Sequence, residues 1–274
     1  MRRLVNLRPG RMGAFYLGAL PFLLVLLIYL VASDLRLAAN PDDKLLPSFA
    51  RIGAAIADLA LEPNVRSGEL TLWVDTAASL RRLLLGLAIA AVAGFGFGVL
   101  TGLVPYARAA LAPFIAVLSM VPPLAILPVL FIVFGLDEVS KIVLIVIGVT
   151  PFIMRDLAMR VAELPDEQLV KAQTLGASTW QMALRVVGPQ MLPRLIDALR
   201  LSLGPAWLFL IAAEAIAATE GLGYRIFLLR RYLAMDSILP YVAWITLLAF
   251  GLDLLLRQLS RRAFPWFQPA GQRA

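Results

Sequence analysis

The chain has no cysteine and no histidine among its 274 residues. The absence of cysteine excludes disulfide bonds and thiolate metal sites. The absence of histidine removes the commonest general base, transition-metal ligand and near-neutral proton switch. We therefore assign no catalytic residue and no metal ligand, and a membrane enzyme is a poor interpretation of this chain.

A phosphate-binding loop is also missing. No G-x-x-x-x-G-K-[ST] run occurs in the sequence, so the chain cannot cradle ATP phosphates in the P-loop manner. If ATP drives this protein, another polypeptide binds the ATP and its Mg²⁺. We expect no cofactor on this chain itself.

Apolar residues, in contrast, are abundant. They make up 61% of the chain, against about 45–50% in ordinary soluble domains. A membrane span needs about 20 mostly apolar residues, and only helices satisfy their own backbone at these lengths. The sequence therefore predicts an all-α membrane protein with six transmembrane helices. The predicted spans are 13–33, 80–104, 110–135, 139–154, 198–218 and 238–256. The fourth is short unless Lys141 and Arg155 at its ends reach the interfaces.

Basic residues set the expected orientation, because cytoplasmic loops are enriched in Lys and Arg. Both chain ends are basic, which places both in the cytoplasm. The residues are Arg2, Arg3, Arg8 and Arg11 at one end and Arg257, Arg261 and Arg262 at the other. The net charge of +7 then reflects topology, and nucleic acid is not an expected partner.

Two segments test this orientation. Residues 13–33 resemble a signal peptide in their basic flanks, but the apolar run is long and no small-residue cleavage site follows, so we expect a retained span. The loop 219–237 is expected outside although it contains Arg225 and two further arginines. We expect these arginines to pair with Glu220 and Asp236.

A polar island at residues 164–193 separates two apolar spans. Pro165 and the two acids after it suit a first helical turn, and Gly176 suits a left-handed residue at a helix end. Ser178 with Gln181 three residues later forms a capping box. The pattern predicts helix, tight turn, helix at the membrane surface. It is typical of a docking element, and an ordinary connector is the alternative.

This island resembles the "EAA" loop of permease subunits of bacterial ABC importers, through LVKAQTLGAS and the later MLP. In that family the loop docks into a groove on a separate ATPase. Val170 and Lys171 depart from the usual Glu and Ala. The residues assigned to ATPase coupling by this resemblance are Glu167, Val170, Lys171, Ala172, Leu175, Gly176, Ala177 and Ser178.

Four further stretches resemble the nitrate/sulfonate/taurine group of these permeases: 79–102, 113–141, 212–227 and 261–266. The resemblance covers roughly 75–266. It implies small polar solutes, and it is strongest toward permeases that accompany urea carboxylase and guanidine-degrading enzymes. A urea- or guanidinium-like nitrogen compound is therefore an expected substrate class beside nitrate-, sulfonate- and taurine-like solutes.

Small residues form a stripe at helical spacing in the second span. Such a stripe lets two helices approach closely in lipid. We expect close helix packing rather than solute contact here. The residues are Gly86, Ala90, Gly94, Gly98 and Gly102.

Two features mark a candidate pathway. Prolines interrupt the third span, which predicts either a gate or a kink needed for packing; the candidate gate is Ser119, Met120, Val121 and Pro122. Glu214 lies deep in the fifth span, where a carboxylate is costly unless it is paired or faces a cavity. A pathway role and a structural hydrogen-bonding role both remain open, with the structural one favoured.

The resemblance implies the type I ABC importer permease fold, with one peripheral helix and a five-helix core. It implies a homodimer with two cytoplasmic ABC ATPases below and an extracytoplasmic solute-binding protein above. ATP binding would close the ATPases and open the pathway outward. The alternative is a self-sufficient channel or secondary transporter. The predicted parts are a cytoplasmic N-terminus (1–12), a peripheral span (13–33), an extracytoplasmic segment with an amphipathic helix (34–74), a core (75–257) with a coupling loop (159–195), and a cytoplasmic C-terminus (258–274).

Overall fold

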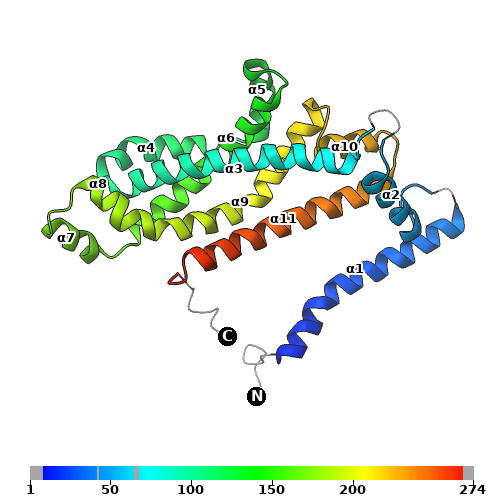
Figure 1. Cartoon of the computed structure of the whole chain (residues 1–274), viewed down its shortest axis with the longest axis horizontal. Helices are drawn as coiled ribbons and strands as arrows, with labels where there is room; N and C mark the ends of the chain where they lie inside the picture. Colours follow the sequence, from blue (N-terminus) through cyan, green and yellow to red (C-terminus); the bar gives the residue numbers. More distant parts are fainter. Residues whose placement is uncertain (1–8, 42, 65–67, 268–274) are drawn as a thin grey trace.

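The computed structural model describes residues 9–41, 43–64 and 68–267, and no strand occurs among them (Figure 1). Arg2, Arg3 and Arg8 lie outside the described residues. The helices are α1 (Arg11–Ala39), α2 (Phe49–Leu61), α3 (Thr71–Leu103), α4 (Pro105–Leu118), α5 (Leu127–Phe134), α6 (Glu138–Ala162), α7 (Asp166–Thr174), α8 (Thr179–Gln181), α9 (Gly188–Ala217), α10 (Leu222–Arg230) and α11 (Met235–Ala263), with a 3₁₀ turn at Pro123–Ile126 and a π-helical turn at Met182–Val187.

Five helices are long and apolar enough to cross a membrane, and α4 with the segment up to Phe134 forms a sixth, bent span. The two halves of this span meet at 78°. The prediction of an all-α protein with six spans is confirmed. Because the prolines at positions 122 and 123 prevent a continuous helix, the third span is broken rather than merely kinked.

The fourth span differs from its prediction. It runs to Ala162 instead of ending at 154, so it is long enough to cross without help from its ends. Lys141 does not reach an interface. Its buried ammonium donates to the carbonyls of Leu136 and Asp137, both at 3.2 Å. Arg155 consequently lies within a span rather than at its end.

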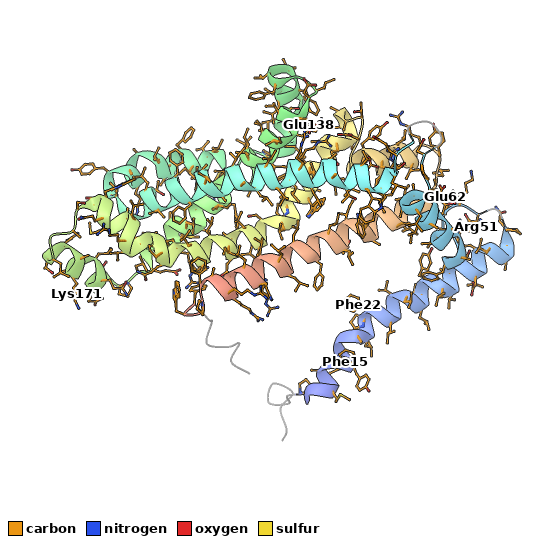
Figure 2. All side chains as sticks on the ribbon, viewed as in Figure 1. Phe15, Phe22, Arg51, Glu62, Glu138 and Lys171 are labelled. Atoms are coloured by element: carbon orange, nitrogen blue, oxygen red, sulfur yellow. The ribbon has the colours of Figure 1, made fainter. Side chains whose placement is uncertain are left out.

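The core is built around α3, α6 and α9, with α11 against α9. α1 stands apart from this bundle (Figure 1), and the window that makes it a candidate span has no buried residue. Its Phe15 and Phe22 (Figure 2) are 69% and 78% exposed. Such a surface is satisfied by lipid, and it agrees with a peripheral helix.

The far end of α1 is tied to the segment that follows it. Tyr29 donates a 2.6 Å hydrogen bond to the carbonyl of Pro47, and Arg36 pairs with Asp43. Hydrogen bonds from Arg36 and from the backbone N–H of Leu45 hold the pKa of Asp43 below its usual value. These contacts orient α1 from one end only.

The predicted amphipathic helix is α2. Ser48 caps it by accepting from the backbone N–H of Arg51 in its first turn, and Glu62 follows its last residue (Figure 2). One face of α2 packs against α3 and α11, and the indole N–H of Trp73 donates to the carbonyl of Ala60 at 3.1 Å. The apolar face is thus covered by protein at least in part.

The stripe of small residues on α3 lies against α6, as expected. A Cβ at Gly94 would come within 2.6 Å of Ile153, and one at Gly102 within 2.5 Å of Val161. Side chains of α6 therefore occupy the space that larger residues on α3 would need. This contact explains why the two helices approach so closely.

We predict that Gly94→Ala destabilises the protein by about 1–3 kcal/mol, because the added methyl overpacks a filled contact. Gly96 is the matched control, since a Cβ there has no neighbour within 4 Å. Gly96→Ala should leave the melting temperature unchanged or raise it slightly. Thermal unfolding of both variants in the same detergent measures the difference; equal melting temperatures would reject the packing assignment.

Candidate coupling loop and translocation site

The coupling loop folds as two helices joined by a tight turn. α7 begins after Pro165 with two acids in its first turn, as predicted. Gly176 has φ +81°, its N–H donates to the carbonyl of Gln173 at 2.9 Å, and the N–H of Ala177 donates to that of Ala172 at 3.0 Å. This pair of bonds is the Schellman arrangement, which requires a left-handed residue. The predicted conformation of Gly176 is confirmed.

The second helix starts with the predicted capping box. The Ser178 hydroxyl accepts from the N–H of Gln181 at 3.3 Å, and the Gln181 side chain accepts from the N–H of Ser178 at 2.8 Å. α8 runs through the π-helical turn into α9 without a loop. The turn at Gly176 is therefore connected to a membrane span by continuous helix.

Several apolar side chains on this loop are exposed. Leu175 is 80% exposed, Trp180 71% and Val170 55%, and Lys171 lies at the extreme end of the bundle (Figure 2). Ala172 and Ala177 are half-buried, whereas Glu167, Gly176 and Ser178 are exposed. Exposed apolar residues around a rigid turn are typical of a protein-binding surface.

The broken span presents the candidate gate residues. Ser119 is half-buried, and its hydroxyl donates to the carbonyl of Ala116 at 2.8 Å while it accepts from Arg155 at 2.9 Å. Met120, Val121 and Pro122 are exposed. Ser119 and Val121 line a cavity of about 360 Å³ between the break, α6 and Phe209 of α9. The break therefore borders an open space in this chain.

Glu214 is fully buried and fully paired. Its carboxylate accepts from Arg82 at 2.7 Å, from the Ser79 hydroxyl at 2.8 and 2.9 Å, and from the backbone N–H of Gly223 at 2.9 Å. Arg82 also makes two 2.7 Å bonds to Glu138. One buried arginine thus joins α3, α6 and α9, which offsets the cost of placing a carboxylate in a span.

A second buried carboxylate extends this polar cluster. Asp75 accepts from the N–H of Gly221 at 2.9 Å, from Arg225 at 2.8 Å and from Tyr241 at 3.0 Å. Gly221 has φ +125°, and a Cβ there would lie 2.6 Å from the Glu214 carboxyl. The turn before α10 can therefore fold onto Glu214 only with glycine at this position.

The partner expected for Arg225 was wrong. Arg225 pairs with Asp75 rather than with Glu220 or Asp236, because the helix carrying it packs beside α3. Arg230 stacks on Phe227 at 5.2 Å, and Glu220 lies 3.6 Å from Arg82. Burial of Arg225 in an ion pair accounts for part of the basic character of the loop.

The structure does not bring the candidate pathway residues together. Glu214 is not among the residues that line the cavity at the break. Arg82, Asp75 and Arg155 were not singled out from the sequence as site residues. Arg82 could have been found from the sequence, because it is an arginine inside an apolar span and such an arginine needs a partner there.

Comparison with known proteins decides the family. The family described as "Binding-protein-dependent transport system inner membrane component" matches residues 86–265. The chain belongs to this family. The matched range includes the broken span, the coupling loop and all of α11.

Several permeases share this core. The taurine transport system permease protein TauC of Escherichia coli K12 is 43% identical over 199 residues, which are 72% of each chain. The nitrate import permease protein NrtB of Leptolyngbya laminosa is 29% identical over 76% of this chain and 75% of its own length. The putative aliphatic sulfonates transport permease protein SsuC of Bacillus subtilis 168 is 29% identical over the same shares.

A solved structure supports the fold. An inward-facing structure of the MetNI methionine ABC transporter superimposes with a TM-score of 0.62 at 19% identity, over 70% of this chain and 95% of that chain. The protein therefore has the type I ABC importer permease fold. It is a multi-pass inner-membrane transport component rather than an enzyme.

We predict that Glu214→Ala destabilises the protein by about 3–5 kcal/mol, because it leaves the buried Arg82 without one carboxylate partner. Glu214→Gln should cost less, since the amide oxygen still accepts hydrogen bonds. The control is Glu220→Gln, whose side chain is 49% exposed and whose loss should cost at most about 1 kcal/mol. Melting temperature and purified yield measure all three.

Transport by the same variants separates the two roles of Glu214. Near-normal transport in Glu214→Gln would agree with the structural role. Lost transport with normal yield in that variant would instead place the carboxylate charge in the pathway.

Proposed function

We propose that two copies of this chain form the translocation pathway of an ATP-driven importer for a small solute that carries an oxyanion group. The names of the related permeases support this substrate class. Their names give taurine, aliphatic sulfonates, nitrate and bicarbonate as solutes. Each of these has an anionic oxygen-rich group, and for this reason we prefer the class over a urea- or guanidinium-like compound.

Coupling to the ATPase would run through the coupling loop (159–195). The support is its exposed apolar surface around a turn that is rigid on both sides. A partner ATPase carries ATP and Mg²⁺, and this chain binds no cofactor. Closure of two ATPases pushes the two loops together and opens the pathway outward, where a solute-binding protein delivers the solute.

The proposed orientation places both chain ends in the cytoplasm. Arg194 at the start of α9 lies 4.6 Å over the ring of Phe267, so the end of the described chain is on the same side as the coupling loop. α1 is tied to residues 43–47 by its other end, which leaves Gly10 on that same side. The loop before α3 and α10 then face the binding protein.

We predict that Gly176→Val weakens ATPase docking while the chain still inserts. A β-branched residue in the left-handed conformation costs about 1 kcal/mol or more. Gly68 is the matched control, because it has φ +70° and, as at Gly176, an added Cβ would meet no other atom within 4 Å. Gly68→Val should carry the same strain outside the loop and leave docking intact. Co-purification and solute-stimulated ATP hydrolysis are the measurements; normal values in Gly176→Val would reject the coupling role.

We predict that single cysteines at Ser119, Met120 and Val121 react with small aqueous thiol reagents, and that ATP changes their rates. The native chain has no cysteine, so each label is unambiguous. Leu26 on α1 is the control for a lipid-facing position. Protection of all three positions with and without ATP would remove them from the pathway.

The rival function is a self-sufficient channel or secondary transporter. Solute uptake into vesicles that contain only this chain, without ATP or an ATPase, would favour it. Uptake that requires ATP, the ATPase and the binding protein supports the importer.

A further inference from the structure

Arg155 lies at the junction of two cavities. One, of about 360 Å³, is lined by Ser119, Gly148 and Phe152 and reaches toward the break in the third span. The other, of about 340 Å³, is lined by Thr101, Arg108 and Ala162 at the inner ends of α3, α4 and α6. Arg155 and Met159 border both cavities. From Glu138 to Arg155 the helix rises about 25 Å, so the junction lies in the inner part of a hydrocarbon layer about 30 Å thick.

The charge of Arg155 has no carboxylate partner among the described residues. Three other arginines on the core spans have carboxylate partners: Arg82 pairs with Glu138 and Glu214, Arg160 with Asp156 and Glu163, and Arg200 with Asp253. Arg155 makes a single 2.9 Å hydrogen bond, to the Ser119 hydroxyl. Its side chain is exposed toward the cavities.

The acid that follows Arg155 in the sequence, Asp156, does not neutralise its charge. Asp156 lines the first cavity, but it lies 3.7 Å from the guanidinium of Arg160 one turn further along α6. Arg108, at the wall of the second cavity, donates to the carbonyls at the end of α3, one of them Thr101 at 3.1 Å. Both cavities are otherwise walled mainly by apolar side chains. The guanidinium of Arg155 therefore presents an uncompensated positive charge to both cavities.

We infer that Arg155 is an anion-binding residue at which the oxyanion group of the solute pauses on its way to the cytoplasm. A guanidinium has five N–H donors in a planar fork that matches a sulfonate, carboxylate or nitrate with two parallel hydrogen bonds. Ser119 accepts one donor and holds the fork in place, and the remaining donors face the cavities. Ser119 is thus a positioning residue, and it links the break in the third span to the site. This inference rests on the proposed function, since it assigns the solute a place in the same pathway.

The proposed site would select solutes by their charge. It favours small solutes with a delocalised negative charge and disfavours cations, because a cation would meet Arg155 without a compensating charge. A neutral molecule of equal shape gains no charge-assisted hydrogen bond there.

The test uses the purified full chain in lipid nanodiscs with a single reporter cysteine at Phe152, an exposed position on the wall of the first cavity. The cysteine is labelled with an uncharged thiol reagent, and the probes are methanesulfonate and its neutral counterpart dimethyl sulfone. With a millimolar dissociation constant, about 10 mM methanesulfonate should slow labelling about tenfold, and dimethyl sulfone should not. Arg155→Gln should abolish this protection.

Arg185→Gln is the control, because it removes an exposed positive charge from a residue that lines neither cavity. It should keep the protection. Equal protection by both probes, or protection that survives in Arg155→Gln, overturns the inference.

Failure of the inference can be told from failure of the proposed function. Labelling at Phe152→Cys and Met120→Cys without any effect of methanesulfonate overturns the anion site and leaves the pathway standing. No labelling at either position overturns both.

Discussion

The arrangement of the core depends on one buried arginine. Arg82 enters a low-dielectric region where an unpaired charge is very costly, and it is neutralised by Glu214 and Glu138 from two other helices. Its remaining N–H groups reach the backbone carbonyl of Glu220, at the turn before α10. Three spans and one turn must therefore meet at this point, or several charges lose their partners together. Asp75 is a second buried charge with partners from other helices, since it accepts hydrogen bonds from Arg225 and Tyr241.

The opposite end of the molecule has a different character. There cavities border α6 and the break in the third span, and the candidate coupling loop exposes leucine, valine and tryptophan. Polar groups at this end are held by helix caps and by hydrogen bonds between residues close in the sequence, rather than by buried ion pairs. The outer end is thus specified by interactions within the chain, whereas the inner end leaves surface and space for other molecules.

Much of this could be predicted from the sequence, because the governing interactions are local. Apolar run length predicts the spans, and Gly176 with Ser178 predicts the turn of the coupling loop from its capping chemistry alone. The small-residue stripe on α3 predicts a close helix contact, although not which helix supplies it.

The remainder depends on approaches between distant segments. Arg82 and Glu214 are separated by 132 positions, and Asp75 and Arg225 by 150, so no spacing rule connects them. The error over Arg225 arose because nearby acids in the sequence were chosen over a distant one in space. Prolines predict a break in the third span, but the 78° angle and the contact of Ser119 with Arg155 follow from packing against α6.

The absence of a loop between α8 and α9 has a mechanical consequence. From Thr179 to Glu214 the chain is continuously helical, which at 1.5 Å per residue makes an arm about 53 Å long. One end is fixed by the ion pair with Arg82, and the other carries the exposed turn at Gly176. A tilt of about 5° around the fixed end would move the free end by about 5 Å over that length. A small rearrangement around Arg82 and a displacement of several ångströms at the turn around Gly176 would therefore be the same motion.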